Sequence, residues 1–474
     1  MGKKSQRKTK KSQPQPLIRT DVWRLVTTPE QKEMMLMTVT CYRKYLLPLV
    51  LIVNAQWSNL APLSSLELVL AVEKMIHVTT ANPNPKHSYY QKIVNKYPDH
   101  RKFPSYLRRA AIAEAIGIVS SFQTRYRSWQ SGNRKKRTAK APRLTAMCKT
   151  YPALYKGQQI LYGKDYQTVA LKVWSGKDWI WLTNIGVKNH GNNRHLVEGN
   201  KLKSPSLVVN KTKCQLSMPV QIKPVKREET DYVCSVDLGI NNAATAAIVG
   251  RDGTVKARTF INPARDIDYR NKRRMMIAKK AKQTSNLTGQ TLPKGFCGGL
   301  NRKSANQNLE ISRKVARQIV QFAKVHGVKV MVLENLWGWK AKAGKKRSLM
   351  KQKFHLWCHR KIVEIITDKW TELGGKVQTV NPKYTSAVAF DGSGKVRRSQ
   401  TNYSLAKFKS GKQYHADLNA SYNIGARYWY CLIVGDKNFS RVYDSKSSDG
   451  TLRTPIVLGT LRNLAVQERM NPHP

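Results

Sequence analysis

Three carboxylates occupy positions from which a fold could bring them together. Asp237 lies within the apolar stretch VCSVDLGINN, Glu334 terminates VKVMVLE, and Asp417 opens the segment ADLNASYNIG. An unpaired charge inside a buried strand is costly, so Asp237 in particular needs a reason to be there. Two-metal hydrolysis of a phosphodiester supplies one, because ions about 3.5–4 Å apart must be held by several convergent carboxylates. Mg²⁺ prefers oxygen ligands and keeps several waters, so a few acids suffice.

Each acid also has a purely structural interpretation. Asp237 could be a buried acid paired with Lys or Arg, Glu334 could form a salt bridge at a strand end, and Asp417 could be a helix N-cap. For each acid taken alone, the structural and the catalytic interpretation are about equally supported. Three acids at a strand, a strand end and a helix start of one α/β unit favour a shared site.

The segment that carries these acids, residues 231–430, alternates between strand-like and helix-like patterns. Strands are predicted at 232–238, 243–250, 254–260, 328–333 and 377–380, and helices at 266–282, 305–326, 349–373 and 416–430. Such alternation is typical of a mixed sheet with helices on its faces. The acids would then project from elements of one sheet and its covering helix.

The preceding half of the chain has a different pattern of predicted helices and strands. A strand is predicted at 17–27, and Thr28-Pro29-Glu30 is typical of the start of a helix, here a long one over 31–54. The helical pattern continues to about residue 134. Residues 150–228 then hold short β-like runs separated by Gly, Lys and Asn turns. We predict a small β-barrel that includes the early strand and is interrupted by a helical insert.

Net charge points to the class of partner. The chain has 85 Lys and Arg against 28 Asp and Glu, a formal net charge of +57 and a pI near 10.3. A folded protein with this charge repels itself unless a polyanion neutralises it, which favours nucleic acid. The 11 Trp and 20 Tyr residues also offer flat faces for bases.

Cysteine spacing and the lengths of apolar runs indicate the cellular compartment. None of the seven Cys residues forms a C-x-x-C pair, which argues against a disulfide framework and a four-Cys zinc site. The first residues lack an apolar signal core, and the longest apolar run, Leu46–Val53, contains Pro48 and is too short to span a bilayer. We expect no membrane partner and a cytoplasmic, nucleoid-associated protein of a prokaryote.

Five segments resemble one known family. VDLGINNAATAAIV, VMVLENLWGW and HADLNASYNIG resemble the three RuvC motifs of the TnpB and compact type V CRISPR effector family, and ISRKVARQIVQFAKVHG and GGKVQTVNPKYTS agree as well. The resemblance covers roughly residues 229–430, in the family's order. It implies an RNase H-like nuclease in which Asp237, Glu334 and Asp417 are catalytic ligands of Mg²⁺ or Mn²⁺. It also implies a guide RNA and a target DNA as partners, bound as an RNA–DNA heteroduplex with a displaced single strand.

The resemblance also implies a domain plan. The fold class is multidomain α/β, in which an RNase H-like RuvC nuclease domain accompanies a small β-barrel wedge domain that is interrupted by a helical recognition domain. The expected boundaries are a disordered basic arm at 1–17, the wedge barrel at 18–30 and 135–228, the recognition domain at 31–134, the nuclease domain at 229–384 and 414–430, a degenerate zinc-ribbon-like segment at 385–413, and a C-terminal tail at 431–474.

The segment between Thr385 and Asp417 departs from the family pattern. The family carries a four-Cys zinc ribbon there, whereas this chain has no Cys in that stretch. The Gly and Phe positions of the ribbon persist, at Gly392, Gly394, Phe408 and Gly411. We therefore expect no zinc. We expect a metal-free remnant that binds nucleic acid through basic side chains, namely Lys395, Arg397 and Arg398.

Two further basic segments are candidates for binding nucleic acid. Residues 335–363 contain nine Lys or Arg and no acid, and the candidates there are Lys340, Lys342, Lys345, Lys346 and Arg347. Such a stretch is either a solvated loop or a segment that guides single-stranded DNA to the acids. Arg273 and Arg274 lie in the second basic segment, the helix predicted at 266–282. His355 and His359 are four residues apart and favour a surface or phosphate contact over a metal pair.

The sequence thus predicts an RNA-guided DNA endonuclease with a RuvC two-metal site. A first alternative is an RNA-guided DNA-binding protein with little or no cleavage, which acts as a repressor or targeting module. A second is a structural RNA-binding protein. The intact carboxylates favour the enzyme, while the missing ribbon favours the guided binder. The choice between a transposon-encoded nuclease and a CRISPR effector stays open, as does the oligomeric state.

Overall fold

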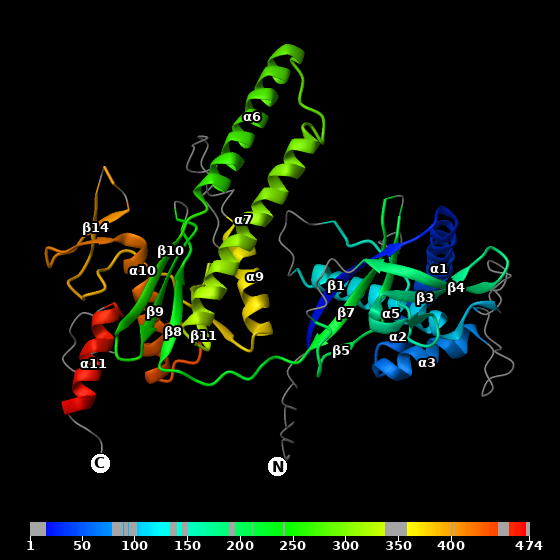
Figure 1. The fold of residues 1–474 in the computed structure, drawn as a ribbon, viewed down its shortest axis with the longest axis horizontal. Helices are drawn as coiled ribbons and strands as arrows, with labels where there is room; N and C mark the ends of the chain where they lie inside the picture. The colour runs from blue at the N-terminus through cyan, green and yellow to red at the C-terminus, as the bar shows by residue number, and fades with distance from the viewer. Residues whose placement is uncertain are drawn as a thin grey trace. The chain divides into compact units, whose positions relative to one another are not determined.

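A computed structural model gives the fold. It describes residues 16–77, 89, 93, 102–132, 140–144, 150–188, 195–210, 212–239, 242–336, 358–399, 401–402, 404–443 and 455–470. The chain divides into two compact units, residues 1–223 and 224–474, and each is described by itself below. Figure 1 labels most of the helices and strands of both units.

A seven-stranded antiparallel sheet organises the first unit. Its strands are β1 (Leu17–Val26), β2 (Ile160–Tyr162), β3 (Thr168–Trp174), β4 (Trp179–Lys188), β5 (Lys201–Leu202), β6 (Ser206–Val209) and β7 (Cys214–Ile222), with the short 3₁₀ helix η4 (Lys164–Tyr166). The strand order is β2-β3-β4-β1-β7-β5, with β6 paired to β7. The early strand β1 pairs with β4 and β7, as predicted. No pairing joins β2 to β5 among the described strands, so the sheet is a half-barrel where a small β-barrel was predicted.

Between β1 and β2 the chain is helical. The described helices are α1 (Pro29–Ala55), α2 (Trp57–Leu60), α3 (Ser65–Ile76) and α5 (Ser105–Gln130). The predicted start of α1 is confirmed by a capping box, in which the Thr28 hydroxyl accepts from the Gln31 backbone N and the Gln31 side chain accepts from the Thr28 backbone N. These helices share one apolar core, centred on α1 and α5.

Helix α1 is long and apolar enough to cross a membrane by length and composition, although the apolar run at 46–53 was judged too short. Just over half of its most apolar stretch, 56%, is buried inside the protein. Tyr45, Leu46 and Leu49 have no exposed surface, and they belong to the core that α1 shares with α5. This burial explains the apolar composition as that of a core helix.

The second unit is built on a five-stranded mixed sheet. Its strands are β8 (Tyr232–Asp237), β9 (Ala244–Gly250), β10 (Val255–Ile261), β11 (Val330–Glu334) and β12 (Lys376–Val380), in the order β10-β9-β8-β11-β12. Strands β8, β11 and β12 run parallel, while β9 and β10 are antiparallel to their neighbours. All five predicted strands are present, within two residues at each end.

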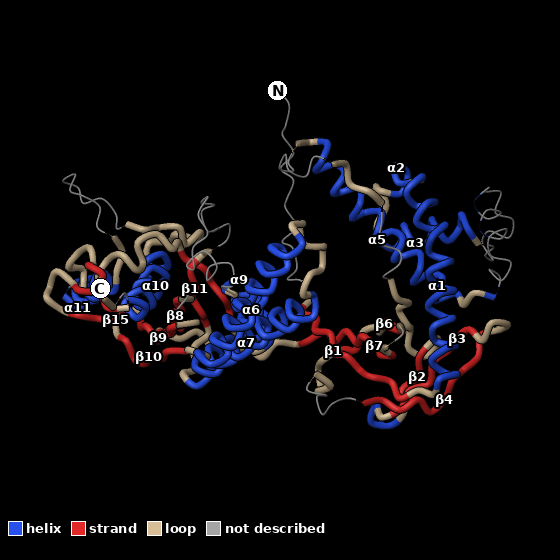
Figure 2. Tube along the Cα trace, turned by 90° about the horizontal axis from the view of Figure 1, so that it is seen from above, coloured by secondary structure: helices blue, strands red, loops and turns tan. Residues whose placement is uncertain are grey.

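Helices cover both faces of this sheet, as Figure 2 shows. On one face lies α10 (Ala416–Ile433), whose side chains share a core with alternate residues of β8, β9 and β11. On the other face α7 (Gly298–Val325) and α9 (His359–Glu372) bury the intervening residues of the same strands. Helix α6 (Ala264–Thr288) pairs with α7 in a long hairpin that extends away from the sheet (Figure 1).

Two smaller elements complete the second unit. Strands β13 (Arg397–Arg398), β14 (Leu405–Lys407) and β15 (Gln413–His415) form a three-stranded antiparallel sheet. Helix α11 (Leu458–Met470) packs against α10 through Leu458 and Leu461. The stretch 431–474, expected only to be a tail, therefore contributes a helix to the core of this unit.

Helix boundaries depart from the predictions more than strand boundaries do. The hairpin helices are longer than the predicted 266–282 and 305–326, because they extend through polar residues that show no apolar periodicity. Of the helix predicted at 349–373 the structure describes α9, which begins at His359 after a non-helical Cys358. Residues 349–357 lie outside the described residues.

Candidate active site

The register of two parallel strands brings Asp237 and Glu334 side by side. Val233 of β8 pairs with Val330 of β11, the register runs to the pair Val236 and Leu333, and the two acids follow as the last residues of their strands. Successive strand residues alternate between the faces of a sheet, so each acid shares a face with the Val four residues before it. Both Val residues belong to the core that α10 covers. The carboxylates of Asp237 and Glu334 therefore project toward the α10 face.

Asp417 meets this sheet edge from the first turn of α10. Asn242, in the loop after β8, donates its amide to Asp417 Oδ2 at 3.1 Å. A Cβ placed on Gly239 would lie 3.7 Å from the same oxygen. The N-cap of α10 is His415, whose Nδ1 accepts from the Asp417 backbone N at 3.3 Å. The interpretation of Asp417 as a simple N-cap is therefore wrong, because His415 already fills that position.

Glu334 and Asp417 act electrostatically on Asp237. The pKa of Asp237 is raised well above its ordinary value, first by burial and then by the charges of Glu334 and Asp417. The nearby Arg398 guanidinium opposes this shift but does not reverse it. Asp237 thus lies where a negative charge is poorly solvated and repelled by two other acids. A bound cation would relieve both costs.

Glu334 has a different set of neighbours. Thr385 donates its hydroxyl to Glu334 Oε1 at 2.5 Å. Burial raises the pKa of Glu334, while the Thr385 hydrogen bond and the Arg427 guanidinium pull it down. Arg427 is only 1% exposed, and burial lowers its pKa to about 10. Glu334 therefore has partners that favour its ionised form, but its one described hydrogen bond comes from a hydroxyl and not from a strand-end Lys or Arg.

The donor chemistry of the three acids fits Mg²⁺ or Mn²⁺, since these ions prefer carboxylate oxygens and water. The side chains are not gathered at a single point, however. In the part of the chain that the structure describes, no three His, Cys, Asp or Glu side chains come close enough together to hold one ion. The structure thus places the acids at one edge of the sheet, and their role as metal ligands stays a prediction.

The segment after β12 is held by aromatic packing. Phe390 lies 5.4 Å from Phe408, 5.0 Å from Tyr414 and 5.3 Å from Tyr422, measured between ring centroids. These rings join the three-stranded sheet to α10 and belong to the main core of the second unit. The sequence pattern showed that the thiolates were missing but did not show that aromatic packing holds this segment against α10.

The basic residues predicted to bind nucleic acid lie in several different elements. Arg398 of β13 donates to the Ser386 carbonyl at 3.2 Å and acts on the charge of Asp237, while Arg397 is exposed. Arg273 and Arg274 of α6 donate to Gln307 and Asn301 of α7. The residues Lys340, Lys342, Lys345, Lys346, Arg347 and His355 lie outside the described part of the chain. Binding of nucleic acid by any of these side chains stays a prediction.

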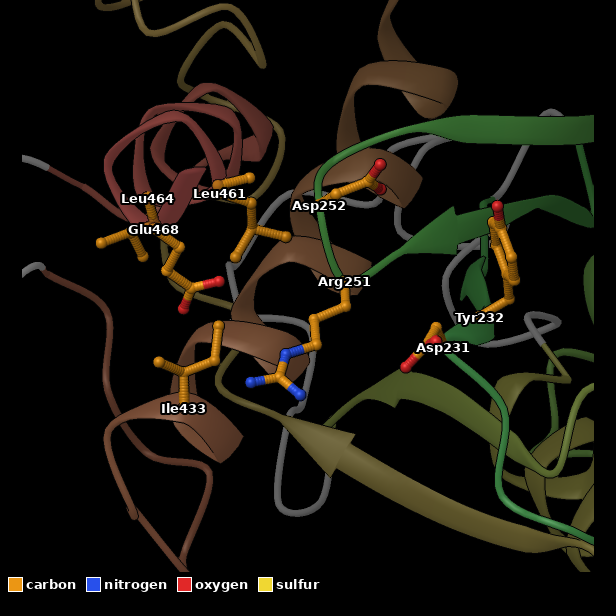
Figure 3. Close-up of a pocket in the computed structure, with 9 residues that line it drawn as sticks. Asp231, Tyr232, Arg251, Asp252, Ile433, Leu461, Leu464 and Glu468 are labelled. Carbon is orange, nitrogen blue, oxygen red and sulfur yellow. The ribbon is translucent and has the colours of Figure 1, made fainter. Parts of the chain in front are cut away.

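Two cavities flank the sheet. One of about 450 Å³ adjoins Glu334 and is lined by one face of α9, including His359, Val363 and Thr367. The other, about 400 Å³, lies at the opposite end of β8, as Figure 3 shows. Its walls are Asp231, Tyr232, Arg251, Asp252, Ile433, Leu461, Leu464, Ala465 and Glu468. The length of β8 separates this second cavity from the three acids.

Three residues near the acids were missed as functional candidates from the sequence. Thr385 lies in the quoted stretch GGKVQTVNPKYTS, which was its only signal. Asn242 and Arg427 carried none, because an Asn in a loop and an Arg within an apolar helix are ordinary in isolation. Only strand register and helix packing bring them to Asp417 and Glu334.

Two family models match parts of the chain. The model of the Aq_aa04 family matches residues 19–175. The model described as Cas12f1-like, TNB domain, matches residues 359–424, which include α9, β12, the three-stranded sheet and Asp417. The second match thus includes the stretch that lacks the family's Cys residues.

Similar proteins are found by sequence and by fold. The TnpB-like protein aq_aa05 of Aquifex aeolicus (strain VF5) is 29% identical over 250 residues, which are 49% of this chain and 80% of that protein. A Cas12f1–sgRNA–target DNA complex gives a TM-score of 0.46 at 12% identity and covers 86% of this chain and 99% of the other. The mini-RNA-guided endonuclease CRISPR-Cas_phi3 gives 0.47 at 12% identity, with 86% and 91% covered. The resemblance to the TnpB and compact type V effector family is confirmed by the second family model and by the sequence relative.

Proposed function

We propose that this chain, which is similar to the TnpB and compact type V CRISPR effectors, is an RNA-guided DNA endonuclease. One observation carries the proposal: Asp237, Glu334 and Asp417, from three distant segments, lie at one edge of one sheet, where burial and the charges of the other two acids raise the pKa of Asp237. Arg398 and Arg427 offset part of this negative charge, and a divalent cation, which carboxylate oxygens bind well, would offset more of it. The unit that carries the three acids would be the RNase H-like RuvC domain, residues 229–384 and 414–430.

In the proposed reaction the protein holds and orients ions through these acids. Bound Mg²⁺ or Mn²⁺ would supply an activated water and stabilise charge on the phosphate. Asp237 and Glu334 would present their oxygens from adjacent strand ends, and Asp417 from the helix opposite. Asn242 would keep Asp417 Oδ2 in place, and Thr385 would do the same for Glu334 Oε1.

The charge of the chain supports the proposed partners. Guide RNA and target DNA would neutralise much of the +57, and base pairing would select the sequence while the protein contacts phosphates. The half-barrel with its helical insert would be the wedge and recognition domains. The segment 385–413 would bind target nucleic acid without zinc, through exposed side chains such as Arg397 and Lys395. We propose that the protein works in the cytoplasm, beside the nucleoid.

One observation favours a second candidate, an RNA-guided DNA-binding protein with little or no cleavage. Within the described ranges no three metal-binding side chains are close enough to share an ion. A guided binder would need the basic surfaces but not a closed metal site. The two candidates differ only in whether phosphodiester bonds are broken.

The test uses protein that has been expressed together with the RNA that co-purifies with it. That RNA is sequenced, and a DNA carrying its complement is incubated with the complex in Mg²⁺, Mn²⁺ or Ca²⁺. We expect cleavage of the matched DNA with Mg²⁺ or Mn²⁺ and little with Ca²⁺, whose looser coordination suits the reaction poorly. Binding of matched DNA without cleavage in any metal would establish the guided binder. Recovery of protein free of RNA would defeat both candidates.

A further inference from the structure

A row of buried polar side chains on α10 faces the loop after β12. Asn419, Asn423 and Arg427 are spaced four residues apart, so they lie on one face of the helix, and each is at most 1% exposed. All three donate to backbone carbonyls of the loop, residues 381–390. Asn419 Nδ2 donates to the Val388 carbonyl at 2.8 Å, and Asn423 Nδ2 donates to the Thr385 and Val388 carbonyls at 3.0 and 2.9 Å.

Two further hydrogen bonds, made by Asn419 and Arg427, join the same helix face to the same loop. The Asn419 Oδ1 accepts from the Phe390 backbone N at 2.8 Å, and Arg427 Nη1 donates to the Asn381 carbonyl. Buried polar groups are costly unless hydrogen-bonded, so three of them directed at one loop fix its backbone firmly. The loop is fixed even where it is strained, since Tyr384 has a left-handed φ of +69°, which is uncommon for a residue other than Gly.

The residue after this strained position is the one that contacts the acid site. Thr385 is 2% exposed, and its carbonyl is one of the two that Asn423 binds. Its hydroxyl has one hydrogen and two acceptors within reach: Glu334 Oε1 at 2.5 Å and the Pro382 carbonyl at 3.0 Å. The shorter contact is to the carboxylate oxygen, and an ionised carboxylate accepts hydrogen bonds more strongly than a carbonyl does. Thr385 thus holds one oxygen of Glu334 and leaves the other, Oε2, free of this bond.

We infer that Thr385 is a positioning residue for Glu334, set in place by the polar row of α10, and that its hydroxyl orients the carboxylate for the divalent cation. The inference rests on the proposed function, because it concerns the same metal site. It assigns a role to the hydroxyl alone and not to the bulk of the side chain. Outer-shell partners of metal ligands typically contribute 10–100-fold in metal affinity or activity.

The experiment compares substitutions that keep or remove this hydroxyl. Thr385→Val keeps the shape but removes the donor, while Thr385→Ser keeps the donor and removes a methyl group. Thr385→Ala serves as a second hydroxyl-free variant if the Val variant does not fold. Thr38→Val in the first unit is a matched control. The Thr38 hydroxyl is also buried, and it accepts from the Trp174 backbone N at 2.7 Å, so its loss should destabilise the protein without touching the acids.

The first readout is Mn²⁺ affinity of the RNA-loaded protein, taken as the binding that Glu334→Ala removes, so that ions held by the RNA do not count. The second is the rate of guide-directed cleavage at saturating target. We expect Thr385→Val to weaken Mn²⁺ binding about 10–100-fold and to lower the cleavage rate while the Kd for target is unchanged. Thr385→Ser and Thr38→Val should bind Mn²⁺ like the wild type.

Other results overturn the inference. It is wrong if Thr385→Val binds Mn²⁺ as tightly as the wild type, or if Thr385→Ser is as weak as Thr385→Val. Wild-type protein with no Glu334-dependent Mn²⁺ binding would overturn both this inference and the nuclease proposal. Wild-type protein that binds Mn²⁺ but never cuts would overturn the nuclease proposal alone, and the affinities of the variants would still decide the role of Thr385.

Discussion

The carboxylates near the two ends of strand β8 have pKa values shifted in opposite directions. At its carboxyl end, Asp237 is buried beside Glu334 and Asp417, and its pKa is raised. Beyond its amino end, near the cavity of Figure 3, Asp252 occupies the turn between β9 and β10. Burial alone would raise the pKa of Asp252. Hydrogen bonds from the Thr254 backbone N at 2.9 Å and hydroxyl at 2.8 Å, together with the Asp252 backbone N–H and the Arg469 charge, outweigh burial and lower it.

This difference separates an acid whose own turn stabilises its charge from an acid whose charge is opposed by burial and by two other acids. Asp252 receives from its own turn the donors that a carboxylate needs, so its negative charge is already stabilised. The raised pKa of Asp237 shows that the protein supplies too little to balance its charge. Perturbed carboxylates of this kind cluster at functional sites, although structural networks can also produce them. The comparison therefore supports the proposal that the chemistry takes place at the carboxyl end of β8.

The largest expected effect is on cleavage. Asp417→Ala and Glu334→Ala should lower guide-directed cutting on the order of 10³-fold, because a metal ion supplies several kcal/mol of transition-state stabilisation and each 1.4 kcal/mol is about tenfold. Asp252→Ala should leave cutting unchanged. Target binding should survive in all three, since Lys and Arg contacts to phosphate supply the affinity. Rates measured at saturating target check this, and equal losses at both ends of β8 would contradict the comparison.

The second largest expected effect concerns the aromatic cluster of the segment next to the three acids. Phe408 is 5% exposed in the aromatic cluster that joins the three-stranded sheet to α10. Phe408→Ala should lower the free energy of unfolding of this region by about 3–5 kcal/mol, as for other buried Phe residues, and should reduce cleavage. A zinc chelator should leave both properties of the wild type unchanged, because the segment has no thiolate to hold zinc. Hydrogen exchange of residues 385–415 measures the first property.

The smallest effect is a pair of stability changes with opposite signs. A raised pKa means that the Asp237 contribution to stability is present at low pH and is lost as pH rises through its folded pKa. Asp237→Asn should therefore stabilise metal-free protein, increasingly so toward higher pH. A lowered pKa means the reverse for Asp252, whose contribution is lost as pH falls. Asp252→Asn should cost about 0.5 kcal/mol near pH 7, the lower end for a hydrogen bond because the turn is solvated.

Thermal unfolding in the presence of a chelator measures both changes. A change of 1 kcal/mol shifts Tm by about 2–4 °C in a unit of this size. The two variants serve as controls for each other, since both replace Asp with Asn in the same sheet. If Asp237→Asn lowered Tm as Asp252→Asn does, burial of the Asp237 charge would not destabilise the metal-free protein.

Much of the second unit could be predicted because buried parallel strands appear in sequence as continuous apolar runs. Strands β8 and β11 were placed within two residues, and this placement put Asp237 and Glu334 at neighbouring strand ends. The α6–α7 hairpin was predicted less well, because polar helices that project from a core show little apolar periodicity. Helix α11 was missed, since its packing against α10 depends on contacts distant in sequence.

The supporting residues of the site could not be predicted at all. Thr385 reaches Glu334 only because strand β12 lies next to β11 and the polar row of α10 fixes the following loop. Asp417 was open to interpretation as an N-cap, since nothing in sequence shows that His415, two residues earlier, accepts the capping hydrogen bond. Such assignments require register and helix packing, which composition and spacing do not encode.

The most direct measurement of the central claim is anomalous diffraction from crystals of the protein bound to its guide RNA and matched DNA in Mn²⁺. The account predicts one or two anomalous peaks at the carboxyl ends of β8 and β11, in contact with carboxylate oxygens of Asp237, Glu334 and Asp417. It also predicts no peak in the cavity beside Asp252. Absence of a peak at the three acids in that complex, while they remain ordered, would contradict the assignment of this edge of the sheet as the metal site.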